Sequence, residues 1–313
     1  MGWLQHERLL SDIVNKINGA RNKKNPADTA NDYFEALNSL YKSYYDYRKE
    51  HGRLTSYEKT KGYQDKNSFR ELVFQGLNSA NKIELLNLPA VFELAHFEPL
   101  IMSDEILGLM KYNPKNIDQD TRNEASVNHA EFKQAYAEYL RKKNDSHAIG
   151  KALGKLCNLL YVVRCNLQHC GKTPNGPDLD KAERDKLVCS KVLPIIDGLF
   201  DILFCKPDNR LAVYGTLMQG KENHSIIGGI KGKWNKGHVS GVTDIVNGYP
   251  MLSWIMNTKT VDVEVLDSIQ MKNNFSAIDR FEGDTYQRFW IPIFCEGKWI
   301  VGNIYGKNPT SPL

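Results

Sequence analysis

Leu211-Ala-Val-Tyr-Gly-Thr-Leu217 is a short apolar run that breaks at a glycine, and it stands where the character of the chain changes. Up to about residue 206, apolar residues recur at the spacing of three and four that is typical of amphipathic helices. Beyond residues 207–210 the sequence consists of short β-branched and aromatic runs between glycines, which indicate strands and tight turns. We therefore expect an α+β protein with two domains: an all-helical one over 1–206, in which 1–60 is a helical extension, and a strand-rich one over 207–313.

The expected elements of the second domain are a strand that runs into a turn over 211–217, two hairpins, one further strand and one helix. Asn247-Gly248 and Glu296-Gly297 are turn pairs at the centres of the hairpins, and the first is well suited to positive backbone angles. Together they predict a compact mixed sheet, closed or half-closed, with a helix against it. The hairpins are expected over 242–254 and 289–305, the strand over 261–265 and the helix over 267–281.

A second motif, Ile278-Asp-Arg-Phe-Glu-Gly-Asp-Thr-Tyr-Gln-Arg288, follows later in the chain. Together with the first run, and with Gly220 and Asn223 at their spacing after it, this segment resembles the gamma-glutamylcyclotransferase-like family. The resemblance covers residues 211–306 in order. It implies a small mixed β-barrel that cyclises a gamma-glutamyl compound, releasing 5-oxoproline and an amine.

The resemblance also implies which residues form the site. A glycine-containing loop of backbone N–H groups can hold a carboxylate or amide oxygen without a charged side chain. A pocketed glutamate can take a proton from the attacking amine and return it to the leaving amine, and partial burial raises its pKa toward the working range. The implied catalytic residue is Glu282, and the implied substrate-binding residues are Tyr214, Gly215, Thr216, Leu217, Tyr286 and Arg288.

The helical part carries a motif of its own, Arg164-Cys-Asn-Leu-Gln-His169, at the end of a helix expected over 148–169. This motif resembles the HEPN superfamily of helical bundles, many of them dimeric, metal-independent ribonucleases, over about 65–205. The resemblance makes Arg164 and His169 catalytic and lets Asn166 orient either the phosphate of an RNA or the histidine. A histidine can accept the ribose 2′-OH proton while an arginine stabilises the charged phosphorane.

Helix geometry leaves alternatives open for this motif. Residues five apart on an ideal helix point about 140° apart, so Arg164 and His169 converge only if the helix loosens or two chains meet as a homodimer. They could equally be a surface arginine and a helix-end histidine favoured by the helix dipole. A rival pair, Arg141 and His147, has the character of a solvated turn.

The bulk composition points to an ordinary globular protein. The chain has 313 residues, a net charge of +4 and 25% charged residues, which does not by itself favour nucleic acid. Its six cysteines lack the paired spacing of a zinc site, so we expect no metal, no cofactor and a reducing cytoplasmic location. Residues 1–8 lack a secretory pattern, and no apolar run approaches the roughly 18 residues of a membrane span.

Three functions remain in competition. The first is an effector in which a HEPN-type ribonuclease is fused to a cyclotransferase-like domain, as would suit a bacterial toxin or antiphage defence. The second is a metabolic gamma-glutamylcyclotransferase whose helical half only mediates dimerisation or interaction. The third is a protein in which both halves only bind, against which the intact Glu282 argues. The expected partners are a gamma-glutamyl small molecule, RNA and a second copy of the chain.

Overall fold

The computed structural model describes residues 3–97, 119–169, 179–256 and 258–307. The chain divides into two compact units, one comprising Met1–Gly19 with Leu203–Leu313 and the other Ala20–Ile202. The domain boundaries expected from the sequence, 1–206 and 207–313, stay a prediction. The division into units differs from them in one respect: the first residues of the chain group with its C-terminal part.

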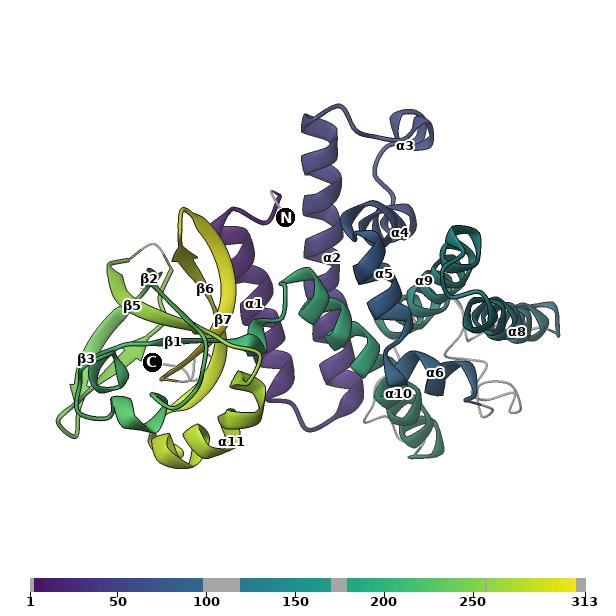
Figure 1. The fold of residues 1–313 in the computed structure, drawn as a ribbon. Helices are drawn as coiled ribbons and strands as arrows, with labels where there is room; N and C mark the ends of the chain where they lie inside the picture. The colour runs from purple at the N-terminus through teal and green to yellow at the C-terminus, as the bar shows by residue number, and fades with distance from the viewer. Residues whose placement is uncertain (1–2, 98–118, 170–178, 257, 308–313) are drawn as a thin grey trace. The chain divides into compact units, whose positions relative to one another are not determined.

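The unit Ala20–Ile202 contains helices and, among its described residues, no strands (Figure 1). Within it α8 packs along α9, and α4 packs against both α2 and α9. This agrees with the prediction of a helical N-terminal part, whereas a HEPN bundle in particular stays a prediction. The helices are α2 (Pro26–Glu50), α3 (Ser56–Lys61), α4 (Asp65–Gly76), α5 (Ser79–Leu86), α6 (Pro89–Ala95), α8 (Gln119–Arg141), α9 (Ser146–His169) and α10 (Leu179–Leu203).

Side-chain caps fix several of these helix starts. The side chain of Asn25 accepts a hydrogen bond from the backbone N–H of Ala27, and Thr55 and Glu58 form a reciprocal capping box at the start of α3. Such bonds satisfy N–H groups that have no partner within the helix.

Five strands of the other unit close into a barrel in the order β1-β5-β2-β6-β7. Neighbouring strands are antiparallel except β1 and β7, which pair in parallel at Leu211 and Asn303 and close the barrel. The prediction of a small mixed barrel is confirmed. The strands are β1 (Arg210–Val213), β2 (Lys233–Ser240), β5 (Thr260–Asp267), β6 (Gln287–Cys295) and β7 (Lys298–Gly306), and β3 (Val242–Val246) and β4 (Tyr249–Ser253) form a separate hairpin.

One helix, α11 (Met271–Glu282), packs on the outside of the barrel. Its apolar residues Met271, Phe275 and Ile278 are buried in the same cluster as Leu211 and Val213 of β1. Burial of such a stripe is what holds an amphipathic helix on a sheet. The packing brings the last residue of α11 toward the end of β1, where the candidate site lies.

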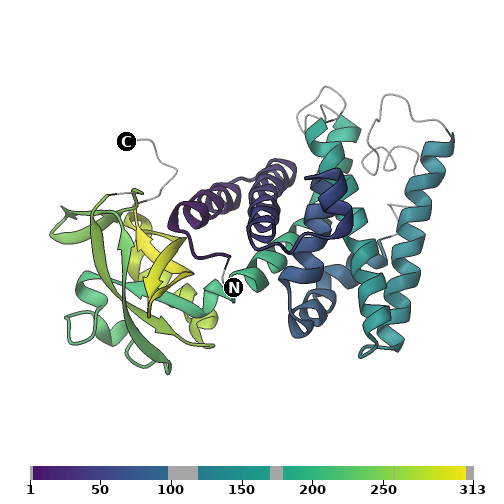
Figure 2. The ribbon, with the colours of Figure 1, turned by 90° about the horizontal axis from the view of Figure 1, so that it is seen from above.

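Helix α1 (Glu7–Arg21) runs beside β6 and β7 in both views of the ribbon (Figures 1 and 2). The buried side chain of Asn18 donates to the backbone oxygen of Trp290 (2.8 Å) and accepts from its N–H (3.1 Å). Gln5 makes the same pair of bonds to Trp299, at 3.3 and 2.9 Å. Two amide side chains thus take the place of a neighbouring strand at these peptides, because they offer the same donor and acceptor.

None of the helices that the structure describes combines the length and apolar character that crossing a membrane requires.

Candidate active site

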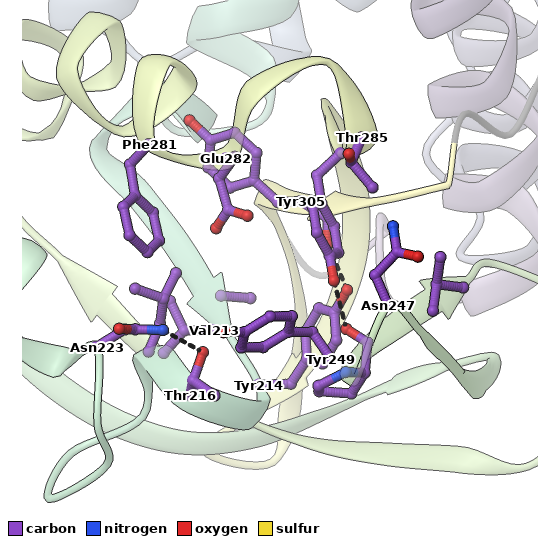
Figure 3. A pocket seen from close by; sticks show the side chains of 15 residues that line it. Val213, Tyr214, Thr216, Asn223, Asn247, Tyr249, Phe281, Glu282, Thr285 and Tyr305 are labelled. Carbon is purple, nitrogen blue, oxygen red and sulfur yellow. Dashed lines mark hydrogen bonds between the residues drawn. The ribbon is translucent and has the colours of Figure 1, made fainter.

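A pocket with a volume of about 400 Å³ lies between the end of β1, the hairpin β3–β4 and the end of α11 (Figure 3). Segments far apart in the sequence therefore meet in one cavity, as binding sites in folded domains commonly require. The residues that line the pocket are Ala212, Val213, Tyr214, Thr216, Leu217, Asn223, Val246, Asn247, Tyr249, Pro250, Phe281, Glu282, Thr285, Tyr286 and Tyr305.

The loop after β1 forms one wall. Strand β1 ends at Val213, and Gly215–Leu217 continue as a single 3-10 turn. Gly215 has φ +65°, and a Cβ atom there would lie 2.5 Å from Cγ of Pro250, so both the backbone angle and the space require glycine. The N–H groups of Gly215 and Thr216 are the first of the turn and have no carbonyl partner within it. Of these two residues, Thr216 lines the pocket.

The tyrosine hydroxyls at the pocket make bonds within the protein. Tyr214 donates to the backbone oxygen of Tyr305 (2.8 Å) and accepts from the N–H of Leu252 (2.9 Å), joining β7 to β4. Tyr286 donates to the oxygen of Pro250 at 3.2 Å. Burial raises the pKa of both phenols, so they stay protonated near neutral pH. Both hydroxyl groups therefore bind the hairpin, Tyr214 by accepting from Leu252 and Tyr286 by donating to Pro250.

Glu282 ends α11, and Gly283, with φ +62°, takes the chain out of the helix. The glutamate is partly buried, and its carboxylate points into the pocket toward the side on which Thr216 and Asn223 lie (Figure 3). Burial raises the pKa of this carboxyl group from 4.5 to about 7. At neutral pH the group thus exists in both protonation states, as an acid–base catalyst requires.

Arg288 lies outside the set of lining residues. Its Nε is 2.9 Å from Oδ1 of Asp279, its Nη1 donates to Oδ1 of Asn303 (3.2 Å), and its guanidinium lies 4.1 Å from the ring centre of Phe275. Asp279 also accepts from the hydroxyl of Tyr305 at 2.5 Å. Arg288 therefore ties α11 to β6, and a substrate contact for it stays a prediction.

Of the other predicted residues, Tyr214, Thr216, Leu217, Glu282 and Tyr286 line the pocket, whereas Gly215 shapes the loop without lining it. Sequence reasoning missed a further wall, formed by the hairpin β3–β4 with Thr285 and Tyr305. The turn pair at 247–248 predicted the hairpin, but no local signal shows that it overlies the end of β1. The wall residues of the hairpin are Val246, Asn247, Tyr249 and Pro250.

The predicted ribonuclease residues lie in the other unit. Arg164 is 7% exposed, and its Nη2 is 2.9 Å from Oδ2 of Asp65 at the start of α4. The side chains of Asn166 and His169 lie outside the described residues, so the pairing of Arg164 with His169 stays a prediction. The rival residues Arg141 and His147 flank an exposed turn between α8 and α9.

Within the described part of the chain, no group of three or more histidine, cysteine, aspartate or glutamate side chains could hold a metal ion.

Residues 211–312 match the family model described as gamma-glutamyl cyclotransferase, AIG2-like. The match covers the barrel, α11 and every lining residue of the pocket. It agrees with the resemblance carried by the two sequence motifs. The C-terminal part of the chain is thus similar to the cyclotransferases in sequence.

Solved structures offer more distant similarities. An AIG2-like protein from Mus musculus is 22% identical over 33% of this chain and 80% of its own, with a TM-score of 0.28. An uncharacterised protein from Pyrococcus horikoshii is 23% identical over the same shares, with a TM-score of 0.26. A variant of allophanate hydrolase from Kluyveromyces lactis is 11% identical over 80% of this chain and 54% of its own, with a TM-score of 0.25. None of the curated proteins matches this chain.

Proposed function

We propose that the C-terminal unit is a gamma-glutamylcyclotransferase, which converts a gamma-glutamyl amide into 5-oxoproline and a free amine. The observation that carries this proposal is the meeting of Glu282, with its raised pKa, and the 214–217 loop in one pocket. Perturbed carboxyl groups in a cavity are candidates for acid–base catalysis. The family match over the same residues supports this choice of reaction.

The reaction needs one proton carrier and one site for an oxyanion. The substrate reacts as its free α-amine, after its ammonium group has lost one proton to solvent. This amine attacks the γ-carbonyl carbon while the carboxylate of Glu282 takes a proton from the attacking nitrogen. Negative charge then develops on the carbonyl oxygen, for which the N–H groups of Gly215 and Thr216 are suitable donors. When the tetrahedral intermediate collapses, the bond to the leaving nitrogen breaks and Glu282 returns its proton to that nitrogen. No water is consumed.

The hydroxyl groups at the site support the assignment of proton transfer to Glu282. Tyr214, Tyr286 and Tyr305 each donate their proton to an oxygen of the protein, at 2.8, 3.2 and 2.5 Å. A proton held in this way is less available for transfer to a substrate. Glu282 is the lining residue whose pKa falls near neutrality.

The test is release of 5-oxoproline from a panel of gamma-glutamyl amides. Glu282→Gln keeps the shape of the side chain but cannot accept the proton, so we expect kcat to fall by roughly 100-fold or more. Glu222→Gln, at an exposed glutamate that does not line the pocket, is the matched control and should keep wild-type turnover. Turnover by a folded Glu282→Gln variant at the wild-type rate would rule out the role of Glu282.

For the helical unit, the ribonuclease activity, the RNA substrate and the homodimer remain predictions from the Arg164/His169 motif. The ion pair of the buried Arg164 with the half-buried Asp65 favours a structural role for this arginine. This supports the alternative in which the helical unit is a dimerisation or interaction module. Roles in toxin action or antiphage defence depend on the same motif, and the cytoplasmic location expected from the cysteines stays a prediction. RNA cleavage in EDTA that is lost in His169→Ala would favour the ribonuclease.

A further inference from the structure

Thr216 and Asn223 lie side by side on the wall of the pocket opposite Glu282 (Figure 3). The amide Nδ2 of Asn223 donates to the hydroxyl Oγ1 of Thr216 at 3.1 Å. The backbone N–H of Asn223 also donates to the backbone oxygen of Thr216 at 3.0 Å. Both side chains are partly buried. Asn223 thus binds Thr216 twice, once through the backbone and once through the side chain.

The side-chain bond has a consequence for the hydroxyl proton of Thr216. A hydroxyl group carries a single proton and can accept through its two lone pairs. The amide nitrogen of Asn223 donates to Oγ1 and cannot accept a hydrogen bond. The hydroxyl proton of Thr216 must therefore point away from Asn223. Thr216 lines the pocket, so its hydroxyl is available as a donor to a ligand.

The charges around the pocket show which ligand group needs such a donor. The residues that line it in the described structure include no lysine, arginine or histidine, and Glu282 is their one acidic member. A carboxylate bound here is therefore held by neutral donors. It also favours the wall away from Glu282, because like charges repel at short range.

We infer that Asn223 is a positioning residue, which orients the Thr216 hydroxyl to donate to the α-carboxylate of the substrate. This inference depends on the proposed function, since it concerns a gamma-glutamyl substrate. The α-carboxylate then lies against Thr216 and the α-ammonium group faces Glu282. Asn223 thereby sets the orientation in which Glu282 can remove the proton of the attacking amine.

The first test separates binding from chemistry in steady-state kinetics. Thr216→Val keeps the shape of the side chain and removes the donor. A hydrogen bond to a carboxylate in both the bound substrate and the transition state acts mainly on KM. We expect KM to rise roughly 10- to 100-fold with kcat within about threefold. Thr216→Ser, which keeps the hydroxyl, should recover most of the lost affinity. Thr258→Val, at an exposed threonine outside the pocket, is the control.

The second test asks whether Asn223 acts through that hydroxyl. Asn223→Leu should raise KM when Thr216 is present, but should add little to Thr216→Val, because the two changes then remove the same interaction. Additive effects would overturn the positioning role. The product 5-oxoproline keeps the carboxylate, so its affinity should fall in the same variants in which KM rises. Calorimetry with Thr216→Val and Asn223→Leu, each combined with Glu282→Gln, measures this affinity.

The outcomes distinguish the two proposals. If the wild-type protein releases no 5-oxoproline from any gamma-glutamyl amide and does not bind this product, the proposed function is wrong. If it turns over such substrates while Thr216→Val keeps the wild-type KM and product affinity, the proposed function stands and the inference is wrong.

Discussion

Gly215 packs against Pro250 so closely that a Cβ atom on residue 215 would lie 2.5 Å from Cγ of the proline. This contact joins the loop after β1 to strand β4 of the separate hairpin, and Pro250 itself lines the pocket. The close approach makes the position of the loop depend on the position of the hairpin.

The first prediction concerns this contact. Gly215→Ala should lower the free energy of unfolding by roughly 2–4 kcal/mol, because the alanine meets both an unfavourable φ of +65° and the ring of Pro250. Gly220→Ala is a matched control: its φ is +73°, but nothing lies within 4 Å of the added Cβ. We expect it to cost only about 1 kcal/mol from backbone strain. Urea denaturation measures both, and equal losses would show that the close approach is unimportant.

A second prediction addresses the attachment of the hairpin. Tyr214→Phe removes a hydroxyl that both donates to the oxygen of Tyr305 and accepts from the N–H of Leu252. Two backbone groups lose their partner, so we expect a loss of roughly 1–3 kcal/mol in unfolding free energy. Tyr286→Phe loses one longer bond, to Pro250, and should cost less. The reverse order of stability would show that the Tyr214 hydroxyl is not the main attachment of the hairpin.

The third prediction is a pH dependence set by Glu282. Burial raises the pKa of this carboxyl group from 4.5 to about 7 in the folded protein. Between these values the folded state holds a proton that the unfolded state has lost, so this group makes stability fall as pH rises from about 4.5 to 7. Glu282→Gln should remove that part of the decline. Parallel curves of stability against pH for the two proteins would show that the pKa is not raised.

The same pKa predicts the pH profile of activity. The general base must be ionised in the free enzyme, so kcat/KM should rise with pH to an inflection near 7. Measurement of 5-oxoproline release across pH 5–9 checks this expectation. An inflection near the ordinary glutamate value would place the working carboxylate in open solvent.

A further prediction concerns helix α1, which binds β6 through Asn18. Asn18→Leu removes both bonds to the buried peptide groups of Trp290, and should lower the unfolding free energy of the barrel unit by roughly 1–3 kcal/mol. Asn273→Leu, at an exposed position of α11, is the control. A fragment of residues 207–313 that unfolds at the same denaturant concentration as the full chain would show that α1 contributes nothing to the barrel.

The two hairpins could be predicted because their signals are local. Asn247, Gly248, Glu296 and Gly297 all have positive φ, between +51° and +86°, which short turns between strands require. Strand β2 (Lys233–Ser240) was not predicted, because its lysines, asparagine and glycine lack the alternation of a half-buried strand. Its pairing with β5 and β6 makes it a strand.

The N-terminal part shows the same limit. Residues 59–62 have the polar, glycine-ended character of a loop, yet most of them belong to helix α3, because the Thr55–Glu58 capping box starts a helical turn there. The apolar spacing over 67–82 would suit a single helix, but the chain forms two there, since α4 ends at Gly76 and Asn78 caps α5. Turn and cap chemistry acts over three or four residues, and small shifts in where it acts move the boundaries of the elements.

The amino-acid sequence was sufficient to name Glu282 and the 214–217 loop as candidate site residues, because two short motifs carry the resemblance to a known family that implies them. The raised pKa of Glu282, and the hairpin wall formed by Asn247, Tyr249 and Pro250, exist only in the folded chain. The hydrogen bond between Asn18 and Trp290, residues 272 positions apart, likewise forms only when the chain folds. Burial and close approach depend on which distant segments meet, and no local pattern of residues carries that information.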